Sequence, residues 1–345
     1  MIDTVKSWIT RHINRDSLEL GIKISVGIVI SILLAEFIGM DFAPSTGVVA
    51  LLSIQATKRE SVKTAVRRII SFGYTLGICY LVHDEIGANT AAFTLAVLGI
   101  VLLSVLLGWA DTLSVNIVIA VHLFMMHQPF TQHLVINETE RVIIGMTVAF
   151  LVNWYTPNRE AAYQKRFSSL ESEMSQLLIL YGSFLRGQQA MDTGEAMLKS
   201  IKKKIEDGMR DAQNFYNNTL RLHAKYYVNY MGMREREWVL LSNIKKELDT
   251  LQNVPQSGAY LAEYAEEMAK TIAVERPLEE WGKNYETVYE KMNAIPLPSD
   301  RVEFQEQTAL FSVLNDFNEI VQIKRNFIAG LTETQKKRYW RKMNQ

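Results

Sequence analysis

The sequence predicts an all-α membrane protein in two parts. Residues 1–157 are expected to form a six-span transmembrane bundle, and residues 158–345 a cytoplasmic antiparallel helical bundle of the four-helix type. The first observation is charge: residues 1–156 hold 10 Lys and Arg and 11 Asp and Glu, whereas the remainder holds 27 and 26. The second is the spacing of apolar residues, which form long runs in the first part and helical stripes in the second.

Six apolar runs occupy the first part, at residues 20–38, 42–56, 69–82, 88–107, 113–126 and 142–155. A helix needs about 20 residues to cross the hydrocarbon, so the first and fourth runs are long enough and the others are short. The short connections leave no polar helix faces to meet water, which favours spans over core helices of a soluble protein. Small residues at four-residue spacing, such as Gly73 and Gly77, predict close packing of the spans.

Lys and Arg gather on one side of the predicted membrane. Lys6, Arg11 and Arg15 precede the first run, and five cations from Lys58 to Arg68 separate the second run from the third. The opposite connections carry almost none. The positive-inside rule therefore places both termini in the cytoplasm, and it predicts that the short second run crosses fully.

The second run opens with Phe42-Ala-Pro-Ser-Thr-Gly47, which contains Ser45 and Thr46. Proline and glycine so near the start of a short apolar helix predict one of two arrangements. The helix is broken or begins late, with its hydroxyls facing protein or a water-filled cavity, or an ordinary loop ends in a helix cap. We include Ser45 and Thr46 among the candidates for a substrate or proton pathway.

Ionisable residues inside predicted spans are the other pathway candidates. Glu36 lies near the outer end of the first run, where its carboxylate can also reach the interface. Asp111, Ser114 and His122 share one helical face of the fifth run, a layout typical of a proton relay. Asp111 is alternatively a helix N-cap. His122 and His127 diverge on the helix, so no metal pair is expected.

Arg67 and Arg68 lie where the third run begins, at the cytoplasmic mouth. Such cations fix the orientation of a membrane protein or touch anionic lipid. The alternative is that they capture small anions from the cytoplasm, because a basic mouth raises the local concentration of anions.

Helical periodicity continues through the second part, at about residues 167–185, 194–222, 226–254, 259–293 and 301–331. Turn signals separate these stretches, and the alternation typical of strands is absent. Four or five helices of this length predict an antiparallel bundle. The sequence contains no nucleotide-binding loop, no His and Cys metal cluster and no nucleophile constellation. We therefore expect no enzyme activity, cofactor, metal or nucleic-acid partner.

Several of these features together resemble the aromatic acid exporter family, the relatives of fusaric acid resistance proteins. They are the six short spans, the Pro-Ser-Thr-Gly opening, Arg67 and Arg68 before a small-residue span, and the exit Asn153-Trp-Tyr-Thr-Pro-Asn158 into a helical tail. The resemblance covers the whole chain and is to a Gram-positive branch with one six-span half. It implies a bacterial plasma-membrane protein. Many relatives have Gly-Thr soon after the arginine, where this chain has Ser71-Phe72.

The resemblance implies a proton-coupled exporter of aromatic or other small organic acids. Larger relatives carry two six-span halves, so a single half implies that two copies pair as a homodimer. The same layout also resembles plant malate channels, which makes an anion channel the first alternative. A membrane-anchored helical interaction protein that transports nothing is the second.

Overall fold

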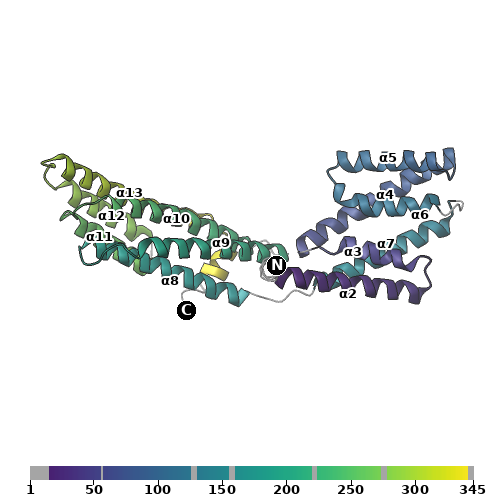
Figure 1. Ribbon diagram of the computed structural model, residues 1–345, viewed down its shortest axis with the longest axis horizontal. Helices are drawn as coiled ribbons and strands as arrows, with labels where there is room; N and C mark the ends of the chain where they lie inside the picture. The colour runs from purple at the N-terminus through teal and green to yellow at the C-terminus, as the bar shows by residue number, and fades with distance from the viewer. Residues whose placement is uncertain are drawn as a thin grey trace, which may run out of the picture. The chain divides into compact units, whose positions relative to one another are not determined.

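The computed structural model describes residues 15–55, 57–125, 130–154, 160–219, 224–272 and 278–340 (Figure 1). Within these ranges the chain forms helices joined by turns, and no strand. Its contacts divide it into two compact units, Met1–Pro157 and Asn158–Gln345. The all-α class is therefore confirmed.

The helices of the first unit, from purple to teal in Figure 1, are α2 (Arg15–Ile38), α3 (Ala43–Ser53), α4 (Lys58–Ile86), α5 (Thr90–Leu106), α6 (Leu113–Met125) and α7 (Gln132–Trp154). A 3₁₀ turn, Ala110–Thr112, precedes α6. Helix α3 packs against both α2 and α7, while α5 packs against α4 and α6. The apolar core of this unit lies chiefly among α4, α5, α6 and α7.

Two stretches in the described part of the chain are long and apolar enough to cross a membrane, Leu18–Ile38 within α2 and Lys58–Ile86. Ala43–Ser53, Thr90–Leu106 and Ala110–Phe124 are apolar but shorter. Aliphatic side chains on α2 are exposed, as lipid-facing residues would be. The number of six crossings stays a prediction.

Helices α4 and α7 begin ten or more residues before the corresponding apolar runs in the sequence. Helix α4 begins at Lys58, with Thr57 as its N-cap, so the five cations lie on the helix rather than in a connection. Helix α7 begins at Gln132, ten residues before the predicted run. Charged residues interrupt hydropathy without interrupting a helix, because the helical backbone satisfies its own hydrogen bonds whatever side chains it carries.

Helix α3 is short. Phe42 adopts a left-handed conformation (φ 56°, ψ 43°), and α3 begins at the next residue with a proline in its first turn and no side-chain cap. Its 11 residues rise about 16 Å, roughly half of the hydrocarbon thickness. A Cβ on Gly145 of α7 would lie 2.8 Å from Val49, so the glycine lets α3 and α7 approach closely. Both ends of α3 therefore lie where backbone groups need partners inside the protein.

The second unit contains α8 (Glu160–Leu185), α9 (Gly194–Asn218), α10 (Lys225–Asp249), α11 (Gly258–Thr271), α12 (Leu278–Asn293) and α13 (Arg301–Ala329). Helix α8 packs against α9 and α11, and α10 packs against α9 and α13. The predicted stretch 259–293 is two helices, α11 and α12, separated by residues outside the described ranges. A short helix, Glu333–Gln335, and a π-helical turn, Lys336–Trp340, follow α13.

The core of the second unit contains a buried ion cluster centred on Arg234 of α10. Its guanidinium donates to Glu171 of α8 at 2.7 Å, to Glu237 at 2.7 Å and to the Ile272 carbonyl after α11 at 3.0 Å. Tyr230 donates to the same Glu171 carboxylate and accepts from Arg234 Nε at 3.0 Å. Burial lowers the pKa of Arg234, but Glu237, Tyr230 and Glu171 outweigh it and hold that pKa well above its usual value. The guanidinium therefore stays charged and links α8, α10 and α11.

Candidate functional site

We refer to the first unit, Met1–Pro157, as the apolar unit and to the second, Asn158–Gln345, as the helical unit. A second buried ion cluster lies beside the start of α3 in the apolar unit. Glu138 and Arg141 are one turn apart on α7, and Arg141 Nη1 donates to Glu138 Oε1. Their side chains are 1% and 2% exposed, respectively. Ionised groups buried in a membrane protein are costly unless paired, and they usually mark substrate or ion pathways.

His122 of α6 completes this cluster. Its Nδ1 lies 2.9 Å from Arg141 Nη1 and 3.1 Å from Glu138 Oε1. On the other side of the ring, Nε2 lies 3.2 Å from Ser45 Oγ of α3, and the Phe42 ring stacks on the imidazole at a centroid distance of 6.0 Å. We refer to His122, Glu138, Arg141 and Ser45 as the histidine cluster.

The histidine cluster also holds the backbone at the start of α3. Arg141 Nη2 donates to the carbonyl of Asp41 at 2.7 Å. One guanidinium therefore connects an ionisable imidazole, a buried carboxylate and the turn from which α3 begins.

The two neighbours of His122 Nδ1 require opposite hydrogen-bonding roles of that nitrogen, because Arg141 is a donor and the Glu138 carboxylate is an acceptor. An imidazole with a lone pair on Nδ1 accepts from Arg141, whereas one with a proton on Nδ1, either the neutral Nδ1–H tautomer or the cation, donates from Nδ1 to Glu138. Nδ1 cannot do both at once, because a ring nitrogen that carries a proton has no lone pair left to accept from the Arg141 donor. The presence or absence of a proton on Nδ1 therefore determines which of the two neighbours His122 binds.

The other end of α3 is bound by Arg68 of α4. Its guanidinium donates to the carbonyl of Leu52, to Ser53 Oγ at 2.5 Å and to the Val49 carbonyl at 3.5 Å. These groups belong to the last turn of α3, where helical carbonyls lack intrahelical donors and cations are stabilised. Arg68 is only 3% exposed.

Arg67, its sequence neighbour, has a different role. Its Nη1 lies 3.3 Å from Asp111 Oδ1, and the two side chains are 25% and 42% exposed. The structure thus joins a predicted anion-capture residue to a predicted proton-pathway residue. Arg67 and Arg68 diverge because neighbours on a helix point about 100° apart.

The predicted pathway residues separate into groups in the structure. Ser45 and His122 are in contact, whereas Asp111 binds Arg67 and not His122. Thr46 is fully buried and its hydroxyl has no partner in the described chain. Glu36 and Ser114 are exposed. The roles of all these residues stay predictions.

Sequence reasoning missed several buried polar residues. Glu138 and Arg141 precede the predicted run 142–155, so hydropathy did not include them in a span, although helical spacing backwards from Gly145 reaches both. Asn116 of α6 was also missed; it accepts from Ser71 at 3.2 Å and donates to the Tyr74 hydroxyl at 3.4 Å. Tyr74 in turn lies 2.7 Å from Ser104 Oγ, so this network joins α4, α5 and α6.

Comparisons with known proteins match both units. Residues 21–156 match the family model "Aromatic acid exporter family member 1", and residues 160–325 match "Putative aromatic acid exporter C-terminal domain". A relative, "Uncharacterized protein YqjA" of Bacillus subtilis (strain 168), is 23% identical over 313 residues, covering 89% of this chain and 94% of that protein.

A solved structure, "Crystal structure of putative membrane protein from Clostridium difficile 630", aligns with a TM-score of 0.44 and 19% identity. It covers 49% of this chain and 98% of that chain. The two family models together span the apolar unit and the helical unit. They describe a family of transporters, which implies a non-enzymatic role in a membrane. The chain is a membrane protein with helical spans and belongs to the aromatic acid exporter family.

Proposed function

We propose that the protein exports aromatic and other small organic acids from the cytoplasm in exchange for protons. The observation that carries this proposal is the histidine cluster, in which an imidazole lies between a buried carboxylate and a buried guanidinium. Imidazole is the side chain whose charge ordinarily changes near neutral pH, and intramembrane ionisable residues commonly serve proton relays.

Proton binding at His122 Nδ1 displaces the hydrogen bond from Arg141 and replaces it with one to Glu138. Arg141 also binds the Asp41 carbonyl, so a change at the imidazole is transmitted to the start of α3. Helix α3 is about half as long as the hydrocarbon layer is thick, and Arg68 binds its C-terminal end. Discontinuous helices of this kind often form the central binding sites of transporters.

We also propose that the transporter lies in the bacterial plasma membrane, crosses it six times and has both termini in the cytoplasm. The distribution of cations supports this orientation. In a background with Cys79 replaced, a membrane-impermeant thiol reagent applied to intact cells should modify a cysteine at Asn89 and spare one at Glu60. Modification at Glu60 would contradict the orientation.

A homodimer encloses the transport path, because one six-span half corresponds to half of a larger relative. Native mass measurement in detergent should give twice the chain mass. A monomer that retains transport would contradict this part of the proposal.

Flux through the purified protein in proteoliposomes tests the function. Labelled hydroxybenzoate should accumulate against its own gradient when a pH gradient is imposed, and a protonophore should abolish that accumulation. Movement only down the substrate gradient, unchanged by the protonophore, would contradict proton coupling.

An anion channel is the second candidate, and Arg68 is the observation that favours it. Within the described residues the hydrogen bonds of this buried cation go to neutral acceptors, and rings of Arg and Lys line anion-selective pores. A channel would give an electrical current carried by organic anions in planar bilayers, with no accumulation against a gradient.

A further inference from the structure

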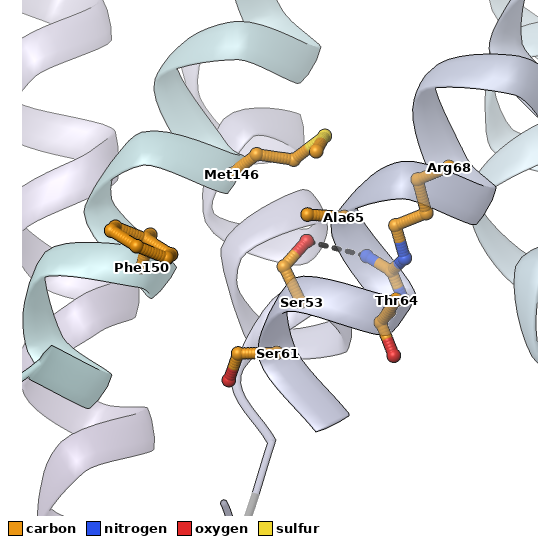
Figure 2. Close-up of a pocket in the computed structure, with 7 residues that line it drawn as sticks. All are labelled: Ser53, Ser61, Thr64, Ala65, Arg68, Met146 and Phe150. Atoms are coloured by element: carbon orange, nitrogen blue, oxygen red, sulfur yellow. Dashed lines mark hydrogen bonds between the residues drawn. The ribbon is translucent and has the colours of Figure 1, made fainter. Parts of the chain in front are cut away.

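A small pocket lies at the far end of α3, between α4 and α7. It is lined by Ser53, Ser61, Thr64, Arg68, Met146 and Phe150 and has an empty volume of about 230 Å³, including the part open to solvent. Figure 2 shows Arg68 reaching Ser53 from α4, with Met146 and Phe150 on α7 across the pocket. This pocket contains none of the residues of the histidine cluster.

In the part of the chain that the structure describes, no acid is hydrogen-bonded to Arg68. Arg67, Arg141 and Arg234 each bind a carboxylate, whereas Arg68 binds two carbonyls and a hydroxyl. Asp111 attracts Arg68 only at longer range, because its carboxylate is bound to Arg67. Buried cations are ordinarily paired with an anion, so the surroundings of Arg68 lack one negative charge.

Two hydrogen-bond donors remain available beside the pocket. The Nε–H of Arg68 is buried and has no acceptor in the described chain. Within the described contacts the Thr64 hydroxyl makes no hydrogen bond, whereas the Ser53 hydroxyl donates to the Val49 carbonyl at 2.5 Å and that of Ser61 donates to the Thr57 carbonyl at 3.0 Å. A guanidinium and a free hydroxyl together fit an anionic oxygen group.

The opposite side of the pocket is apolar. Met146 and Phe150 come from successive turns of α7, and Phe150 is 39% exposed. A thioether side chain is flexible and makes favourable contacts with aromatic rings. Admitting a ring or a short aliphatic body requires Met146 to move, which a flexible thioether side chain permits.

We propose that this pocket binds the carboxylate of a small organic anion, with Arg68 and Thr64 holding the carboxylate and Met146 and Phe150 contacting its apolar body. The choice of a carboxylate rests on the proposed export function, whereas the need for an anion follows from Arg68 alone. A bound carboxylate competes for Arg68 with the carbonyls of Leu52 and Val49. Ligand binding therefore changes the hydrogen bonds at the last turn of α3, and proton binding at His122 changes those at its start.

Equilibrium dialysis of labelled benzoate against the detergent-solubilised full chain tests this site. Thr64→Val removes the free hydroxyl with little change of shape and should raise the Kd for benzoate about tenfold, the loss of one hydrogen bond to a charged group. The matched control is Thr75→Val, because Thr75 is buried on the same helix, its hydroxyl also lacks a partner in the described chain, and it does not line the pocket. This control should leave the Kd unchanged.

Three outcomes would overturn the proposal. Wild-type protein does not bind benzoate, Thr64→Val binds it as tightly as Thr75→Val, or neutral benzamide competes as well as benzoate. A lipid phosphate could fill the same pocket, so a further arm adds phosphatidylglycerol to the micelles. If phosphatidylglycerol displaces benzoate from the wild type at trace amounts, the occupant is lipid and the small-anion proposal is wrong. Because dialysis requires no flux, a protein that binds benzoate at this site but fails to accumulate hydroxybenzoate contradicts the export proposal alone.

Discussion

Replacing Arg141 by methionine should destabilise the apolar unit by about 3–5 kcal/mol, because removing one partner of a buried ion pair leaves the other charge uncompensated. The Glu138 side chain is only 1% exposed. The Asp41 carbonyl also loses its donor. The midpoint of unfolding by sodium dodecyl sulfate, followed by circular dichroism of the full chain, measures the effect.

Two further variants separate charge from shape. Arg67→Met breaks a partly exposed pair, so it should cost about 0–1 kcal/mol. The double replacement Glu138→Leu with Arg141→Met removes both charges and should recover most of the stability, since apolar substitutes for buried pairs are often neutral. If Arg141→Met were no more harmful than Arg67→Met, Glu138 and Arg141 would not form a buried pair.

Replacing Arg234 by methionine should have an effect of similar size in the helical unit. Glu171 and Glu237 would remain buried without their common partner, a loss of about 3–5 kcal/mol. The segment 158–345 carries its own apolar stripes, and we expect it to fold alone. Urea unfolding of that segment, followed by circular dichroism, gives the free-energy difference.

Arg236→Met is the matched control for this prediction. Arg236 is exposed two residues further along α10, and its Nε donates to the Gly232 carbonyl at 3.4 Å. Its replacement should change stability by less than about 0.5 kcal/mol. Equal effects of the two replacements would show that the Arg234 cluster is accessible to water and not a buried network.

Much of the fold could be predicted because helical periodicity and hydropathy are local properties. The long helices α8, α9, α10 and α13 follow the predicted stretches to within a few residues at most ends. The turn signal at Arg276-Pro277 falls inside the predicted stretch 259–293, and these two residues lie outside the described ranges. Hydropathy did not predict the start of α7, because Glu138 and Arg141 are charged residues that lower the local hydropathy. The two side chains pair with each other, so the helix can contain both inside the protein.

The partners of charged residues could not be predicted, because they depend on which helices meet. Helical spacing places Asp111 and His122 on one face, yet α4 supplies Arg67 to the first and α7 supplies Glu138 to the second. From the sequence, Arg67 and Arg68 are predicted to act together in anion capture. In the structure Arg68 binds the end of α3, whereas Arg67 binds Asp111. Tertiary packing, rather than spacing along the chain, selects these pairs.

We expect proton binding at His122 to be coupled to export, and flux through His122→Gln proteoliposomes tests this coupling most directly. Glutamine keeps a polar side chain beside Ser45 but cannot carry the proton. Uptake of labelled hydroxybenzoate is measured with and without an imposed pH gradient, and His133→Gln serves as the control because His133 is an exposed histidine on α7. We expect wild type and His133→Gln to accumulate hydroxybenzoate under the gradient, and His122→Gln to equilibrate it without accumulation. Undiminished accumulation by His122→Gln would contradict the account.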